Sequence, residues 1–155
     1  MDCSIYYHTE LTNQSLTDDE LLWLIGVAFW VFNSNVHLII ELIDREHHNR
    51  SNSSWFDFIR LTAGGIKDYH NLVVNILGEE IYDEFSKLVD ERNAIMHSFP
   101  SGEKRDGYYV AIYRDKHSLQ STIIDKKYIV HFIESNQELC TKLTQFNHKN
   151  MQSYN

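Results

Sequence analysis

The feature that most constrains this chain is a run of apolar residues, near its start, spaced for one long helix. The run follows "TDDE" at 17–20, a capping box in which Thr17 and Glu20 satisfy each other's backbone donors. The pattern predicts a helix from about Asp18 to about His48. Its first half is apolar on nearly every side, which predicts a central position in a helical bundle. The periodic positions are Leu21, Leu24, Ile25, Ala28, Phe29, Phe32, Val36, Ile39, Ile40 and Ile43.

The same helix raises the question of a membrane. Its most apolar stretch, "LLWLIGVAFWVF" at 21–32, is 12 residues long, whereas a transmembrane helix needs roughly 20. The opening "MDCSIYYHTE" lacks the basic region of a secretory signal. Cys3 and Cys140 stand far apart without a metal-ligand spacing, as expected in a reducing compartment. We therefore expect a cytoplasmic protein without a membrane partner.

The remainder of the chain predicts further helices and one β-hairpin. Tyr, Val and Ile dominate residues 108–124, and "RDKHS" within them supplies a turn, which indicates a hairpin. Residues 99–107, "FPSGEKRDG", break the helical pattern before it. The expected helices are 55–63, ended by Gly64 and Gly65; 66–77, closed by Gly78; 79–98; and 126–149, capped by Asp125.

These elements predict a mainly α fold: a bundle of four to five helices with a small hairpin before the last helix. The chain has 155 residues, which suits one domain, 1–155, with a core that needs no disulfide or metal. The fold class by itself implies no activity.

The charge distribution separates the two parts of the chain. The net charge is −8, which argues against a general nucleic-acid coat protein. Residues 1–91 hold 16 Asp and Glu against 5 Lys and Arg, whereas residues 92–155 hold 6 against 9. The sign thus changes at Arg92, as expected if one surface receives an anion.

Arg92, Asn93 and His97 lie at that boundary, in "VDERNAIMHSFPSG" at 89–102. With 6 arginines and 9 histidines in the chain, this spacing arises about 0.35 times by chance, so it is weak alone. Its context is more informative, because the predicted helix ends at Pro100 and side chains at such ends are often functional. Five helical residues place His97 about 140° around the axis from Arg92. Either the helix unwinds near His97, or a second copy in a two-fold dimer completes each site.

The segment "ERNAIMHS" resembles the R-x4-6-H motif of the HEPN superfamily (higher eukaryotes and prokaryotes nucleotide-binding), in which Asn often follows the arginine. The layout is also similar: a long first helix, a late motif at a helix end and a final helix. The resemblance implies a metal-independent endoribonuclease without a cofactor, commonly a homodimer, that acts on RNA as a toxin or antiviral-defence effector. Its partners would be the RNA substrate and, in some members, an antitoxin or defence protein.

The resemblance also implies roles for individual residues. His97 would be the general acid and base, and Arg92 would neutralise charge on the phosphate. Asn93 would orient His97 or bind phosphate, and cleavage would leave a 2′,3′-cyclic phosphate. Ser98, Lys104 and Arg105, which follow the motif, are candidate substrate-binding residues. Some toxin members carry a tyrosine two positions after the histidine, which their antitoxin modifies; here that position is Phe99, which has no hydroxyl.

Plainer explanations exist for each of these features. Arg92 and His97 also suit a solvated helix end, where positive charge is favourable, so the chain could be a catalytically silent module that binds a partner protein or nucleotide. His47 and His48 lack a third ligand and are expected at the surface rather than in a metal site. The tyrosines of the hairpin suit either stacking on bases or packing between strands.

Overall fold

A computed structural model of the chain describes residues 19–48, 58, 63–105 and 107–152. Four helices precede a small antiparallel sheet in this part of the chain, and one long helix follows it, which confirms the predicted fold class. The elements are α1 (Asp19–His48), α3 (Ala63–Asp68), α4 (His70–Leu77), α5 (Glu79–Met96), β1 (Phe99–Arg105), β2 (Tyr108–Arg114), β3 (Ser121–Ile124) and α6 (Lys126–Gln152).

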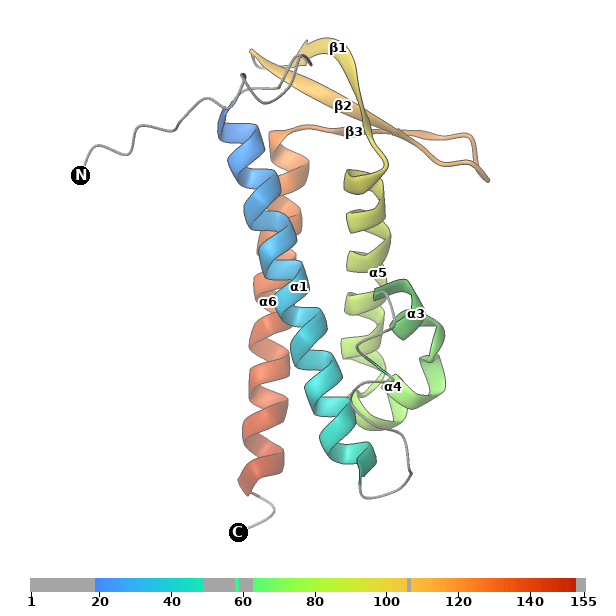
Figure 1. Cartoon of the computed structure of the whole chain (residues 1–155), viewed down its shortest axis with the longest axis vertical. Helices are drawn as coiled ribbons and strands as arrows, with labels where there is room; N and C mark the ends of the chain where they lie inside the picture. The colour runs from blue at the N-terminus through green and yellow to red at the C-terminus, as the bar shows by residue number, and fades with distance from the viewer. Residues whose placement is uncertain (1–18, 49–57, 59–62, 106, 153–155) are drawn as a thin grey trace, which may run out of the picture.

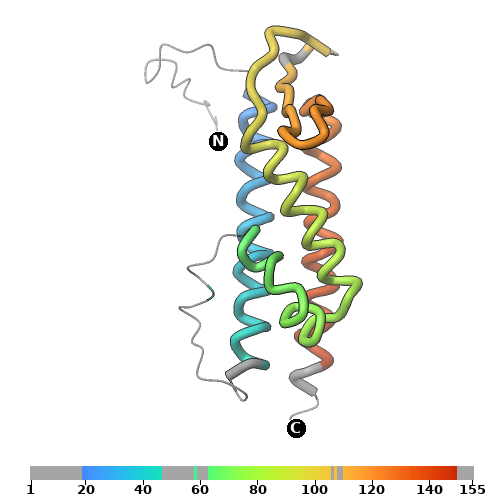
Figure 2. Tube along the Cα trace, turned by 90° about the vertical axis from the view of Figure 1, so that its right-hand side faces the viewer, coloured from blue at the N-terminus to red at the C-terminus, as the bar shows by residue number. Residues whose placement is uncertain are grey.

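The three long helices α1, α5 and α6 lie side by side, and the sheet lies across one end of them (Figure 1). In the view turned by 90°, α5 is inclined across α1 and α6 (Figure 2). Three phenylalanines, one from each helix, meet between them: the ring of Phe32 lies 6.5 Å from that of Phe85 and 5.9 Å from that of Phe132. All three are buried, so this contact joins α5, which carries the predicted site, to α1 and α6.

The first helix has its predicted bounds within a residue. Thr17 of the predicted capping box lies outside the described residues, and Asp19 and Glu20 supply acidic side chains to the first turn, where the helix dipole favours them. By length and composition, the helical segment Asp19–Glu46 is also apolar enough to cross a membrane. Of its apolar 18-residue window, 33% is buried inside the fold. The sequence prediction counted only the 12 consecutive apolar residues, and Asn33, Ser34 and Asn35 follow them without adding a charge.

The second predicted helix boundary was wrong. Gly64 and Gly65 were expected to end a helix, but they lie inside α3, and the chain turns instead at Tyr69. Tertiary packing explains the difference, because Ala63 and Ile66 of α3 are buried. Of the predicted helix 55–63, the structure describes only residues 58 and 63. Gly78 does separate the next two helices as predicted, with a φ of +91°.

The predicted hairpin is confirmed as β2 and β3, whose register pairs Ile112 with Ile123. A third strand, β1, pairs with β2 on its other side, although residues 99–107 were expected to be irregular. This edge strand forms because its backbone pairs with that of β2, although its side chains do not alternate between apolar and polar. An edge strand also tolerates Pro100, which has no N–H to donate. The register of β1 shifts between Pro100 and Lys104, around Gly102, whose φ is +75°.

The last helix begins at its predicted cap. The backbone N–H of Tyr128 donates to Asp125 Oδ1 at 2.8 Å, which satisfies one of the free donors of the first turn. Further along α6, the ammonium of Lys142 donates to both Glu80 and Glu84 of α5. These contacts hold α5 against α6 below the turns that carry the Arg92 motif.

Candidate functional site

The Arg92 motif occupies the last turn and a half of α5, next to the sheet. The helix ends at Met96, and His97 is its C-cap residue, with its N–H donating to the carbonyl of Asn93 at 3.0 Å. The next residue closes the helix end: Ser98 donates to the carbonyl of Ile95 through its backbone N–H at 3.3 Å and its hydroxyl at 2.8 Å. Ser98, predicted to bind substrate, therefore also satisfies a free helix carbonyl.

Arg92 is held by two neighbours. Its guanidinium carbon lies 5.7 Å from the centre of the Phe32 ring on α1, a favourable cation–π geometry. Its Nη1 donates to the side-chain oxygen of Asn93 at 2.9 Å. The side chain is half-buried, so the position of the guanidinium is set by the surrounding protein.

Arg92 forms no ion pair within the described residues, although acidic residues precede it directly. Asp90 pairs with Lys67 of α3, with 2.7 Å between Oδ1 and Nζ, and Glu91 lies 3.7 Å from the ammonium of Lys87. Both carboxylates thus pair with lysines, and neither forms an ion pair with Arg92. A half-buried guanidinium with N–H donors to spare is suited to bind a phosphate or carboxylate from outside the chain.

His97 is exposed, and its ring makes no hydrogen bond or ion pair with another residue that the structure describes. The helical hydrogen bond from His97 to Asn93 is intact, so α5 does not unwind before the histidine. The backbone of His97 therefore stays about 140° around the helix from Arg92. The structure thus keeps the offset around the helix between Arg92 and His97 that the spacing predicts.

Lys104 and Arg105 lie far from the motif. Both are exposed at the end of β1, next to the turn that leads to β2, whereas His97 lies just before the start of the strand. Seven extended residues span about 20 Å, so these side chains and the motif occupy opposite ends of β1. The described residues contain no group of three or more His, Cys, Asp or Glu that could hold a metal ion. The side chains of His47 and His48 lie outside them.

Sequence reasoning missed two features around the motif. The first is Phe32, which looks like any other core residue of α1 and is sixty positions from Arg92. The second is Tyr128 on α6. Burial raises its pKa to about 12, with smaller contributions from Glu91 and Tyr113. Glu91 Oε2 is buried, with no hydrogen-bond partner in the described part of the chain.

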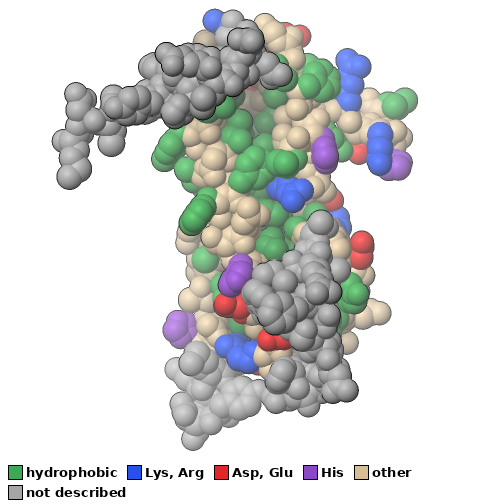
Figure 3. All heavy atoms as spheres, in the orientation of Figure 1, with side chains coloured by type: hydrophobic (Ala, Val, Ile, Leu, Met, Phe, Trp, Pro, Cys, Tyr) green, Lys and Arg blue, Asp and Glu red, His purple; other side chains and the backbone are tan. Residues whose placement is uncertain are grey.

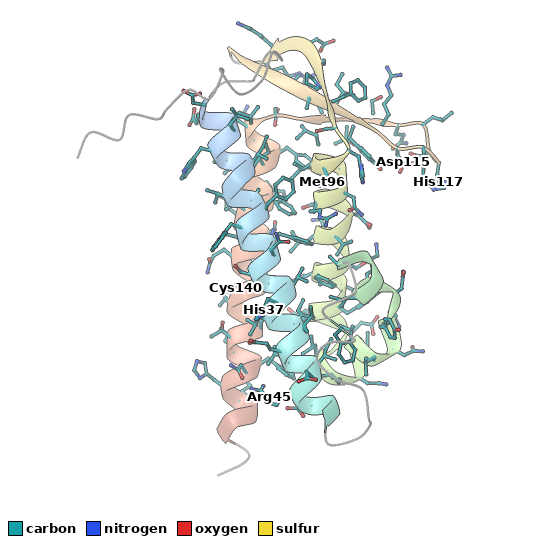
Figure 4. The ribbon with its side chains drawn as sticks, in the orientation of Figure 1. His37, Arg45, Met96, Asp115, His117 and Cys140 are labelled. Atoms are coloured by element: carbon teal, nitrogen blue, oxygen red, sulfur yellow. The ribbon has the colours of Figure 1, made fainter. Side chains whose placement is uncertain are left out.

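The surface beside the motif is apolar. Hydrophobic side chains gather over the half of α1 and α5 nearest the sheet (Figure 3). Met96 is one of them and lies at the sheet end of α5 (Figure 4). It is 52% exposed, and Trp23 and Trp30 of α1 are 63% and 78% exposed. Met96 thus places one exposed apolar side chain directly before His97.

No protein-family model, no curated protein and no solved structure matches this chain. The likeness to the HEPN superfamily therefore rests on the motif and on the order of the helices.

Proposed function

We propose that this protein is a cytoplasmic, metal-independent endoribonuclease of the HEPN toxin or defence type, which acts as a homodimer. One observation carries the proposal: the half-buried guanidinium of Arg92 is held by Phe32 and Asn93 and has no carboxylate partner among the described residues. An arginine in this state can accept a phosphate without first breaking an ion pair. His97, exposed at the adjacent helix end, is free to approach an RNA strand.

The reaction requires proton transfer and charge stabilisation. The neutral His97 ring would take the proton of a ribose 2′-OH while the 2′-oxygen attacks the adjacent phosphorus. The bond from phosphorus to the 5′-oxygen of the next nucleotide breaks, that oxygen takes the proton back from the His97 ring, and the strand ends in a 2′,3′-cyclic phosphate. The guanidinium of Arg92 would stabilise the extra negative charge on the phosphoryl oxygens, and Asn93 fixes that guanidinium.

The test is RNA cleavage in excess EDTA by the wild type and by His97→Ala. We expect His97→Ala to lose at least 100-fold in rate, since general acid–base catalysis contributes about 10²–10⁴-fold. His131→Ala is the matched control, because His131 is an exposed histidine on α6, and it should cut RNA at the wild-type rate. Circular dichroism and sedimentation verify that fold and assembly are unchanged. Equal rates for the wild type and His97→Ala would refute the assignment.

The net charge of −8 favours a second candidate, a catalytically silent module that binds a partner protein or nucleotide. The same assay separates the two. A silent module would leave RNA intact with every variant, while Arg92→Ala would still weaken the binding of inorganic phosphate or a mononucleotide.

A further inference from the structure

The small sheet has one face toward the helices and one face away from them. Ala111 of β2 and its partner Ile124 of β3 pack on the helical core. Because side chains alternate along a strand, Ile112 and Arg114 lie on the opposite face. Phe99 of β1 pairs with Ile112 in the register, and cross-strand partners share a face. We call the face that carries Phe99, Ile112 and Arg114 the outer face.

The register brings one end of the outer face to the motif. The strand β1 starts two residues after His97 and runs away from the end of α5, whereas β2 runs back toward it. Arg114, the last residue of β2, therefore lies on the side of the sheet where α5 ends. The turn that follows, with Asp115 and His117, lies on that side as well (Figure 4). The fold thus returns an arginine to the motif, at the end of the sheet opposite to that of Arg105.

The cations at this end of the sheet are available to a ligand. Arg114 and Lys116 are exposed and form no ion pair with a residue that the structure describes. The carboxylate between them, that of Asp115, is engaged in its own turn, where it accepts the backbone N–H of His117 and the hydroxyl of Ser118, each at 2.9 Å. Lys or Arg side chains and a histidine gather over this turn (Figure 3). An anion can therefore bind here without first breaking an ion pair.

We infer that the outer face next to the motif binds single-stranded RNA, with one base stacked on the ring of Phe99 and a neighbouring phosphate held by the guanidinium of Arg114. Phe99 is 45% exposed, so its ring is open to a base. An exposed aromatic ring beside an exposed cation suits a single strand, because every unpaired base offers a flat π surface and every linkage a negative charge. The inference rests on the proposed nuclease for its purpose, since it specifies which strand would reach His97.

The charge distribution favours RNA at this end of the molecule. The chain has a net charge of −8, so most of its surface repels a phosphate strand. The cations without an ion pair that adjoin the motif are Arg92, Arg114 and Lys116. Lysines along the helices have carboxylate neighbours instead; these are Lys67, Lys87 and Lys142. A phosphate strand is therefore best accommodated where the outer face meets the motif.

The first experiment measures the binding of the full chain to a single-stranded 2′-O-methyl oligonucleotide of about 12 nucleotides, by fluorescence anisotropy. This probe lacks the attacking hydroxyl, so it is bound without being cut. We expect Phe99→Leu to weaken binding at least about 5-fold, because it keeps an apolar side chain but removes the ring on which a base stacks. Phe99→Trp retains a ring and should restore the affinity. Tyr69→Leu is the matched control, because it removes a ring that is 50% exposed between α3 and α4.

The second experiment tests Arg114 through the salt dependence of the same binding. Loss of one phosphate contact reduces the slope of log affinity against log salt by about 0.7 for a single strand. We expect Arg114→Gln to show this reduction, while Phe99→Leu keeps the wild-type slope. Arg45→Gln removes the same charge from the other end of the bundle (Figure 4), so it should keep both the affinity and the slope.

Three results would overturn the inference: unchanged binding in both Phe99→Leu and Arg114→Gln, equal binding of a duplex, or no binding of the probe by the wild type. The last of these would leave the outer face to a protein partner. The nuclease proposal fails separately. Binding that depends on Phe99 and Arg114 without cleavage of RNA would refute the nuclease while the outer-face site stands. Cleavage that depends on His97, with binding unchanged in both variants, would do the reverse.

Discussion

Two buried amides show how single residues fix the alignment of the long helices. Asn35 of α1 and Asn136 of α6 are the buried polar residues of the described core. Asn35 Nδ2 donates to the backbone oxygen of Asn136 at 2.8 Å and to its side-chain oxygen at 3.2 Å, and Asn136 Nδ2 donates to the carbonyl of Phe132. Apolar contacts tolerate sliding, whereas these hydrogen bonds are satisfied in one register of α1 against α6.

Asn35→Ala should therefore destabilise the fold by about 1–3 kcal/mol, because it leaves the buried side-chain oxygen of Asn136 without its donor. Urea unfolding measures the change. Thr144→Ala is the control: its hydroxyl also donates to a helix carbonyl, that of Cys140, but on the exposed side of α6. It should stay within about 0.5 kcal/mol of the wild type. Equal effects of the two changes would show that the buried amides do not hold the helices.

Tyr128 predicts a specific response to alkaline pH. Burial, Glu91 and Tyr113 raise its pKa to about 12, above the ordinary value of about 10. The folded protein thus keeps a proton that the unfolded chain has released, so this contribution to stability is complete below about pH 10 and is lost as the pH rises toward 12. The difference in absorbance at alkaline pH between the wild type and Tyr128→Phe isolates this titration. Glu91→Gln should lower the Tyr128 pKa, while Asp83→Asn, an exposed change on the same helix, should leave it in place.

At the scale of elements, the sequence determined long periodic segments better than short ones. The helices α1, α5 and α6 could be predicted because each repeats an apolar stripe over many turns. The prediction that Gly64 and Gly65 end a helix was wrong, since the sequence pattern cannot show that Ala63 and Ile66 are buried against other elements. The strand β1 was missed for a similar reason: its residues carry no alternation, and its existence depends on the partner strand β2.

Gly78 is a junction that the sequence did locate, and its conformation gives a direct test. With a φ of +91° and a ψ of 159°, it joins α4 to α5 in a region that only glycine enters easily. Gly78→Ala should cost about 1–3 kcal/mol of unfolding free energy, although a Cβ there would meet no atom within 4 Å. The comparison is Asn75→Ala, an exposed change three residues earlier, which should be neutral or slightly stabilising in urea. A neutral Gly78→Ala would mean that the chain relieves the strain by shifting α4.

At the scale of the whole molecule, the sequence could predict which residues form the candidate site but not how they are supported. Arg92, Asn93 and His97 were found from one short segment, and the offset around the helix followed from its spacing. The support of Arg92 by Phe32, and the lysine partners of Asp90 and Glu91, depend on contacts between elements far apart in the chain. One chain thus provides a half-buried arginine without an ion pair and, on another side of the same helix, an exposed histidine whose ring has no partner among the described residues.

This separation predicts complementation between two inactive variants. If Arg92 of one copy acts with His97 of the other, then Arg92→Ala and His97→Ala are each inactive alone. In a mixed dimer, however, the intact Arg92 of one protein meets the intact His97 of its partner, and one of the two sites is restored. Random exchange makes about half of the dimers mixed, so about a quarter of the wild-type RNA cleavage should return. Mixing Arg92→Ala with an Arg92→Ala, His97→Ala double variant leaves no intact arginine and is the matched control. If both mixtures stay inactive while dimers exchange, each site works within one chain, and α5 must then unwind when RNA binds.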